Sequence, residues 1–300
     1  MNNYPAVRRK NPGTAGFYVI GEYVIREYVI REYVTGDRKG KERKGKAAMK
    51  EKLYEIPLND AMDAGEECPF CFLERKAEQE LMDFVLGSCA SYMESDTRAA
   101  TDQEGFCRTH QKKMFDYGNA LGNGWILKTY YKKLLKEMKE EFNHFAPQKI
   151  SLKDRLMKKA GNENSIREWV TSKEKTCYIC DRFSKRYERY VATFFHLYKN
   201  DSAFREKLTN SKGFCFHHFG DLCSGADQYL GDGERKAFYS VLFQLMEENM
   251  ERMSGDIDWF IEKYDYLNRD ADWKQSKDAV QRGMQKIRGG YPADPVYKMK

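Results

Sequence analysis

The sequence predicts a mainly α-helical protein, a pseudo-symmetric helical bundle built from two duplicated halves that are each stapled by zinc. Three observations lead to this fold class. Only 7 of the 300 residues are proline, which favours helices over a turn-rich β-sandwich. Apolar residues recur at helical spacing in several segments. A set of short motifs also occurs twice, at offsets of 108 or 109 residues.

The net charge of +6 is confined to the beginning of the chain. Residues 1–48 carry 11 basic and 5 acidic side chains, so the remaining 252 residues carry 41 of each. A neutral body has no general attraction for phosphate backbones or anionic lipid, and we expect neither a nucleic-acid nor a membrane partner. The sequence has no run of about 18 apolar residues and no pattern of a secretory leader, which predicts a cytoplasmic protein without a membrane span.

The first 48 residues form a low-complexity basic extension. Residues 17–36 repeat a pentapeptide, FYVIG-EYVIR-EYVIR-EYVTG, and a period of five fits neither a strand nor a helix. Residues 39–46, KGKERKGK, can all be encoded by codons made only of purines. A purine-rich stretch just upstream of a methionine, here Met49, is typical of a bacterial ribosome-binding site that has been translated by mistake. We therefore expect natural translation to start at Met49. The alternative is a disordered basic tail that binds an acidic partner.

The body contains the internal repeat. The segment CPFC at 68–71 recurs as CYIC at 177–180, GFCRTH at 105–110 recurs as GFCFHH at 213–218, and LGNG at 121–124 recurs as LGDG at 230–233. These matches place a first half at 49–145, a linker at 146–164 and a second half at 165–255. C-terminal helices at 256–290 and a tail at 291–300 follow.

Each half is expected to form helices that pack through apolar stripes. After each CxxC motif, apolar residues follow at helical spacing: Leu73, Ala77, Leu81 and Val85 in the first half, and Phe183, Tyr187, Tyr190 and Phe194 in the second. After each Gly-rich turn the stripe is longer: Leu127, Tyr131, Leu134 and Met138, then Tyr239, Leu242, Met246, Met250 and Met253. We expect all four stripes to lie in the contacts between helices.

Six cysteines and two histidines make up two copies of the pattern C-x2-C, about 35 residues, C-x2-H. We expect one metal site from Cys68, Cys71, Cys107 and His110, and a second from Cys177, Cys180, Cys215 and His218. Three thiolates and one imidazole suit a closed tetrahedral zinc site, so the pattern predicts two zinc ions. An iron–sulfur cluster and a thiol–disulfide couple are the alternatives.

The spacing has a physical reason. Residues i and i+3 share one face of a helical turn, so each pair can point two ligands at one ion. Pro69 suits the first turn of a helix, and Gly105 and Gly213 suit the turn that precedes one. Each pair would then lie at a helix N-terminus, where the helix dipole favours a thiolate.

The other cysteines and histidines have simpler explanations. Cys89 and Cys223 have no counterpart in the other half and are expected to be free thiols. His217 is expected to be a neighbour of the ligand His218, although it could take its place. His196 is expected to be a core histidine. Glu141 and His144 form a single ExxH, which is too little for a di-iron site.

Three segments resemble an uncharacterised bacterial family that is common in anaerobic low-GC Gram-positive species. They are MKEKLYEIPLNDAM at 49–62, ECPFCFLERKAEQ at 67–79, and the pair GFCRTH and GFCFHH. Members of this family sometimes carry the label of ABC transporter substrate-binding protein, but this sequence lacks the export or lipid-anchoring signal that such a receptor needs. The resemblance implies a domain of unknown function with Cys/His metal sites.

The motifs point to metal binding rather than to a reaction. None of the patterns GxxxxGK[ST], GxSxG, HExxH or GxGxxG occurs, and no catalytic residue is assigned. We expect a zinc-binding protein with two structural sites that serves as an adaptor or regulatory module for a protein partner. A thiol–disulfide enzyme and a zinc or redox sensor are the alternatives.

Overall fold

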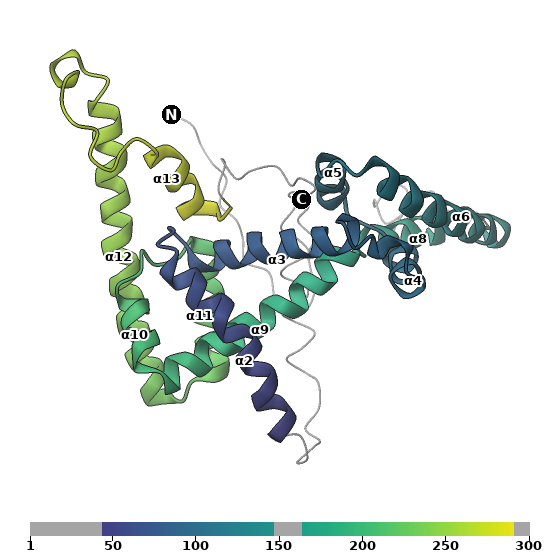
Figure 1. Ribbon diagram of the computed structural model, residues 1–300, viewed down its shortest axis with the longest axis horizontal. Helices are drawn as coiled ribbons and strands as arrows, with labels where there is room; N and C mark the ends of the chain where they lie inside the picture. Colours follow the sequence, from purple (N-terminus) through teal and green to yellow (C-terminus); the bar gives the residue numbers. More distant parts are fainter. Residues whose placement is uncertain (1–43, 147–163, 291–300) are drawn as a thin grey trace, which may run out of the picture. The chain divides into compact units, whose positions relative to one another are not determined.

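A computed structural model describes residues 44–146 and 164–290. Over these residues the chain forms eleven α-helices and two short 3-10 helices and contains no strand, which confirms the mainly α-helical fold (Figure 1). All of these helices belong to one compact unit, Gly40–Lys300. The predictions for residues 1–43, for 147–163 of the linker and for the tail lie outside the described residues.

The helices of the first half precede residue 147. They are α2 (Lys44–Asp63), α3 (Pro69–Leu86), η2 (Ser91–Met93), α4 (Ser95–Glu104), α5 (Arg108–Asp116) and α6 (Ala120–His144). The later ones are α8 (Ser165–Glu174), α9 (Tyr178–Asn200), α10 (Ser202–Thr209), α11 (Phe216–Tyr229), α12 (Asp232–Glu262), η3 (Tyr266–Asn268) and α13 (Ala279–Arg288). Helix α12 runs without interruption across residue 255, the predicted end of the second half.

The two helices that follow the CxxC motifs, α3 and α9, pack against each other and run antiparallel (Figure 1). Phe70 at the start of α3 contacts Phe194 in the later part of α9, with ring centroids 5.7 Å apart. Farther along α3, Glu80 pairs with Arg186 of α9 at 2.6 Å. Each helix therefore begins beside a later part of its counterpart from the other half.

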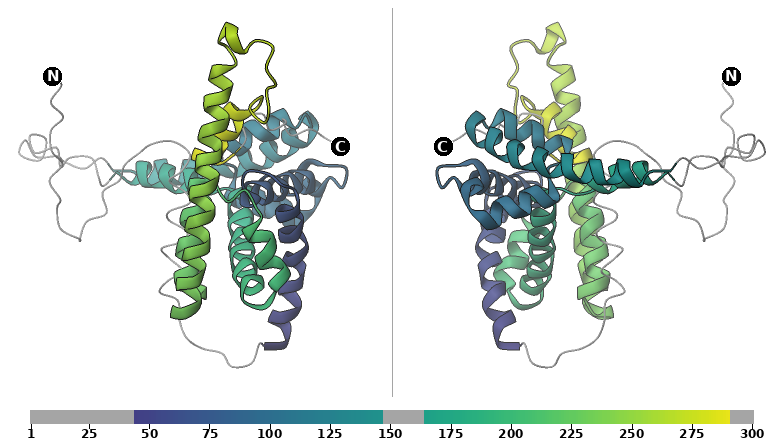
Figure 2. Two further views of the ribbon diagram at one scale, coloured as in Figure 1. Left: turned by 90° about the vertical axis from the view of Figure 1, so that its left-hand side faces the viewer. Right: turned by 90° about the vertical axis from the view of Figure 1, so that its right-hand side faces the viewer.

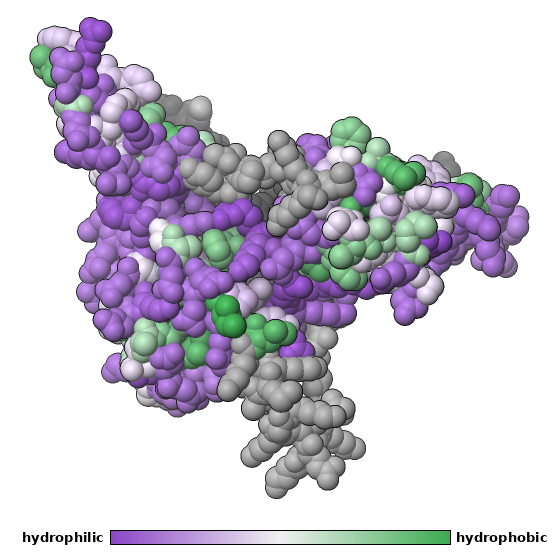
Figure 3. All heavy atoms as spheres, in the orientation of Figure 1, coloured by the Kyte–Doolittle hydropathy of each residue, from purple (hydrophilic) through white to green (hydrophobic). Residues whose placement is uncertain are grey.

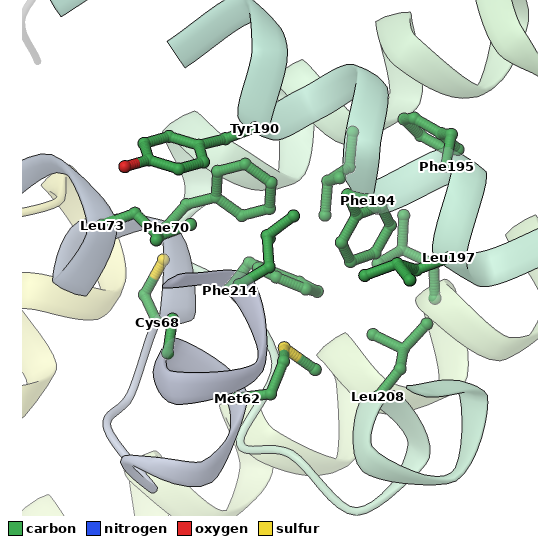
Figure 4. Packing of buried hydrophobic residues seen from close by; sticks show 14 of the residues in the cluster. Met62, Cys68, Phe70, Leu73, Tyr190, Phe194, Phe195, Leu197, Leu208 and Phe214 are labelled. Atoms are coloured by element: carbon green, nitrogen blue, oxygen red, sulfur yellow. The ribbon is translucent and has the colours of Figure 1, made fainter. Parts of the chain in front are cut away.

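Two clusters of buried side chains hold these helices together. The larger one joins α2, the start of α3, α9, α10, α11 and α12, and Figure 4 shows Cys68 beside Phe70 and Leu73 within it. The smaller one joins the end of α3, η2, α5, α6 and the first residues of α9. Since α3 and α9 contribute to both clusters, each half of the sequence supplies side chains to both cores.

The predicted apolar stripes are confirmed on three of the four helices. All four stripe residues of α3 are buried, as are Tyr190 and Phe194 of α9 and Leu242, Met246 and Met253 of α12. On α6 the prediction is wrong for Leu127 and Tyr131, which are exposed because α6 contacts α4 through the neighbouring face, whereas Leu134 and Met138 are half-buried. Thr129 of that face donates a hydrogen bond to Asp102 at 2.6 Å. His196, expected in the core, is exposed on α9.

Candidate metal centres

Each of the four ligand pairs begins at the N-cap of a helix. Cys68, Cys107, Cys177 and Cys215 are the N-cap residues of α3, α5, α9 and α11, and all four have extended backbone angles. The second ligand of each pair lies in the first turn of the same helix, so the predicted placement at helix starts is confirmed. Gly105 and Gly213 precede two of these starts with φ of +62° and +73°, a conformation that glycine adopts without strain.

The first cluster joins the CxxC pair of the first half to the CxxH pair of the second. The Nδ1 atom of His218 lies 3.3 Å from Cys68 Sγ, 3.5 Å from Cys71 Sγ and 3.2 Å from Cys215 Sγ. The sulfurs of Cys71 and Cys215 are 3.7 Å apart. All four residues are buried, and their ligand atoms point at one another. We call this group the inner cluster.

The second cluster has the reverse composition, with the CxxH pair of the first half and the CxxC pair of the second. The Nδ1 atom of His110 lies 3.2 Å from Cys107 Sγ and 3.3 Å from the sulfurs of Cys177 and Cys180. Cys107 Sγ and Cys180 Sγ are 3.8 Å apart. The backbone N–H of Tyr178 donates to the carbonyl of Gly105 at 2.9 Å and ties the two motifs together. We call this group the outer cluster.

The structure thus brings all eight predicted ligands into two clusters, but the expected pairing within each half is wrong. The physical reason is the length of α3, which has 18 residues and carries the chain about 27 Å away from Cys68. Helix α4, with 10 residues, packs against η2, α6 and α9, and Cys107 lies against the buried cluster that contains the end of α3. Since α9 runs antiparallel to α3, Cys177 begins α9 at that same end.

The distances within both clusters suit a tetrahedral ion. A metal with bonds of about 2.3 Å to sulfur and about 2.0 Å to nitrogen gives S···S edges of about 3.8 Å and S···N edges of about 3.5 Å. The observed S···S separations of 3.7 and 3.8 Å match the first value, and they are far from the roughly 2.05 Å of a disulfide bond. The S···N separations of 3.2–3.5 Å are close to the second.

Without a cation the four side chains of a cluster cannot all lose their protons, because neighbouring thiolates repel. In the outer cluster, hydrogen bonds with Cys177 and Cys180 lower the pKa of Cys107. Hydrogen bonds with Cys107 and Cys177 raise the pKa of Cys180. Burial lowers the pKa of His110, but hydrogen bonds, first among them that with Cys107, outweigh this effect and raise it to about 11. A divalent cation would replace the protons that the cluster retains.

Two carboxylates on α3, which the sequence analysis did not single out, face the outer nitrogens of the two histidines. Glu78 Oε1 lies 2.8 Å from His110 Nε2, and the other Glu78 oxygen accepts a hydrogen bond from Lys113 at 2.6 Å. Glu74 Oε1 lies 3.3 Å from His218 Nε2. The hydrogen bond from His110 Nε2 to Glu78 fixes the tautomer that presents Nδ1 to a metal, whereas the buried Nε2 of His218 makes no hydrogen bond in this geometry. Both residues follow Cys71 on the same helix, one turn apart, but nothing in the sequence distinguishes them from the other acidic residues of α3.

Substitution of Glu78 by glutamine is expected to weaken metal binding at the outer cluster about 10- to 100-fold, because the charge that orients His110 is lost. Competition with a chromophoric chelator measures this affinity. Glu80→Gln is the matched control, since Glu80 lies on the same helix and pairs with Arg186 instead. Equal affinities in the two variants would contradict the role given to Glu78.

The two clusters differ in their exposure to solvent. All four residues of the inner cluster are buried, whereas Cys107 and Cys180 of the outer cluster are half-buried. Helix α13 ends against the inner cluster: a Cβ atom on Gly289 would lie 3.3 Å from Cys215 Sγ and 3.6 Å from Cys71 Sγ. Gly289 has no Cβ and a φ of +74°, so it avoids both this contact with the sulfurs and the strain that another residue would have in this conformation.

The remaining cysteines and histidines lie outside the eight-ligand set. Cys89 is exposed and Cys223 is half-buried. His217 does not replace His218, because Nδ1 of His218 faces the three sulfurs of the inner cluster, whereas His217 Nε2 lies 3.4 Å from an Asp221 oxygen. Glu74, His217 and His218 do come close together, with donor atoms within 4.8 Å of one another. His144 bonds the carbonyl of Glu140 at the end of α6.

Comparison with known proteins assigns a family but no activity. The model of a family of unknown function (DUF6062) matches residues 49–294. The chain belongs to this family. The match contains all eight Cys and His ligands and both carboxylates on α3. Comparisons with curated proteins and with solved structures gave no match. In the part of the chain that the structure describes, no helix has the length and apolar character needed to cross a membrane.

Proposed function

We propose that this chain is a zinc-binding structural protein whose two Cys3His sites fasten its two sequence halves to each other, and that it acts in the cytoplasm as an adaptor or regulatory module. The observation that supports this proposal is the pair of tetrahedral ligand sets, each drawn from both halves. Three thiolates and one imidazole favour zinc over harder cations. With four protein ligands per ion, each site is closed and leaves no position for a substrate.

The arrangement also supports a structural role through its topology. A metal in the inner cluster would link Cys71 to Cys215, and a metal in the outer cluster would link Cys107 to Cys180, 73 residues apart. The second link lies within the loop that the first one closes. Ions that bind only the folded chain stabilise it by their binding free energy.

A thiol–disulfide function has less support. The sulfur of Cys71 lies beside that of Cys215, and the sulfur of Cys180 lies beside that of Cys107. Each CxxC pair therefore has a third cysteine, from a CxxH motif, next to it. A redox CxxC pair acts through an exposed thiolate with no third and fourth ligand. None of the eight cysteines forms a disulfide in the structure, which agrees with the reducing compartment that we propose.

Elemental analysis tests the proposal. The full chain, purified anaerobically without chelator, is expected to contain two zinc ions per molecule. Iron together with a visible chromophore would contradict zinc and indicate cluster chemistry. A protein that contains no metal, and in which the six cysteines of the two clusters react as thiols, would contradict the structural role itself.

The difference in burial predicts two rates of metal loss. With excess chelator, we expect one ion to leave in a fast phase from the outer cluster and the other in a slow phase from the inner cluster, as followed with a zinc-sensitive dye. The variant Cys177→Ser should lack the fast phase, and Cys68→Ser should lack the slow one. A single rate for both ions, or the opposite assignment, would contradict the exposure argument.

A further inference from the structure

The end of α12 and the loop that follows it expose a group of large apolar side chains. Ile261, Tyr264, Tyr266 and Leu267 are 63%, 74%, 82% and 74% exposed. We call these four residues the loop patch. Figure 2 shows this end of α12 extending past α13, and Figure 3 shows apolar side chains there beside hydrophilic ones. Large apolar side chains that are grouped on a surface, rather than scattered singly, are typical of a contact site.

Hydrogen bonds from buried and half-buried side chains of α12 and the residue after it fix the loop that carries the loop patch. Lys263 is only 7% exposed, and its Nζ donates hydrogen bonds to the carbonyls of Asn268, Arg269 and Ala271 at 2.7, 2.9 and 2.6 Å. The Trp259 indole N–H donates to the Asp272 carbonyl at 2.9 Å. A loop fixed in this way loses little conformational freedom when it binds.

Aromatic contacts support the same loop. The rings of Phe260 and Trp273 have centroids 5.9 Å apart, and Tyr264 lies 5.4 Å from Phe260 and 6.3 Å from Trp273. Lys274 Nζ lies 3.9 Å above the Trp259 ring. These contacts fix the backbone of the loop that bears the exposed side chains of Tyr266 and Leu267.

The surroundings of the loop patch are acidic. Five exposed carboxylates lie within residues 258–272: Asp258, Glu262, Asp265, Asp270 and Asp272. Arg269 and Lys274 are the exposed basic side chains of residues 258–274. The excess of negative charge repels phosphate backbones and anionic lipid, and attracts a basic protein surface.

We propose that the loop patch docks onto a separate protein whose binding surface combines an apolar cleft with lysine or arginine side chains. Tyrosine and leucine in a fixed loop provide apolar area at low entropic cost, and aromatic anchors dominate many interfaces. The acidic rim selects a basic partner and speeds its approach. This inference goes beyond the metal sites and does not depend on which ion they bind.

The test uses a random peptide library displayed on phage and the full-length, metal-loaded chain. We expect enrichment of peptides that combine aromatic or aliphatic residues with lysine or arginine. Their affinity should fall at least tenfold for the double variant Tyr266→Ser/Leu267→Ser and weaken in about 0.5 M salt. Phe115→Ser is the matched control, because Phe115 is 80% exposed on α5, outside the loop patch. Lys263→Met should also weaken binding while leaving all four apolar side chains in place.

Four results would overturn the proposal. The first is the absence of any enriched class, and the second is equal binding of the enriched peptides to the double variant. The third is concentration-dependent self-association, by sedimentation, that the double variant abolishes, since the patch would then bind a second copy. The fourth is patch-dependent binding to phosphatidylcholine vesicles, which would make it a membrane contact. The metal content is measured on the same samples, so a failure of the metal sites is seen separately.

Discussion

Replacement of Cys71 by serine is expected to remove one metal ion per chain and to destabilise both sequence halves together. Cys71 belongs to α3 of the first half, and its sulfur lies 3.7 Å from that of Cys215 at the start of α11 in the second. A structural zinc ion contributes on the order of 10 kcal/mol to folding, which is comparable to the whole stability of a typical domain. Urea unfolding, followed by circular dichroism, should therefore show loss of helix at a much lower urea concentration.

Cys223→Ser provides the matched control for this loss. Cys223 is half-buried on α11 and lies outside both clusters, so this variant should keep two ions and nearly the stability of the parent chain. A Cys71→Ser protein that has lost one ion but unfolds at the parent urea concentration would contradict the structural role of the inner cluster.

Glu67→Ala is expected to cost about 3–5 kcal/mol of stability, because the buried ammonium of Lys286 loses the carboxylate with which it pairs. Glu67 is 2% exposed and lies directly before Cys68. Its carboxylate is 2.5 Å from Arg252, 3.1 Å from Arg282 and 3.4 Å from Lys286. Burial raises the pKa of Glu67, but these cations, with Arg252 first, outweigh burial and lower the pKa below its usual value. The carboxylate is therefore charged at neutral pH.

The same residue anchors α13 over the inner cluster. Lys286 is 1% exposed, and its Nζ donates a hydrogen bond of 2.9 Å to the Glu67 carbonyl. Denaturant unfolding measures the cost of Glu67→Ala, and Glu80→Ala is the control, since its half-exposed pair with Arg186 is worth about 0–1 kcal/mol. Equal losses in the two variants would contradict the importance of this network.

Much of the fold could be predicted from the sequence because it depends on local patterns. The apolar stripe of α3, Pro69 at its first position and the glycines before α5 and α11 each act within a few residues. The exposed face of α6 was not predictable in this way. Its apolar residues have the same spacing as those of a buried helix, and only the position of α4 decides which face is covered.

The ligands were also predictable, but their partners were not. A duplicated C-x2-C and C-x2-H set satisfies a metal equally well within one half or across both. The choice depends on the antiparallel packing of α3 against α9, which no local pattern encodes. Glu74 and Glu78 were missed for a related reason: on the sequence alone they are two of the four acidic residues of α3, and only the packed structure brings them to His218 and His110.

Metal content of two double variants tests the crossed pairing directly. In Cys71→Ser/Cys215→Ser both substitutions affect the inner cluster, so one zinc ion per chain should remain. In Cys71→Ser/Cys107→Ser the substitutions affect different clusters, and no ion should remain bound. Pairing within each half predicts the reverse. If the first variant lost both ions while the second kept one, the central claim that the two metal sites join the two halves would be contradicted.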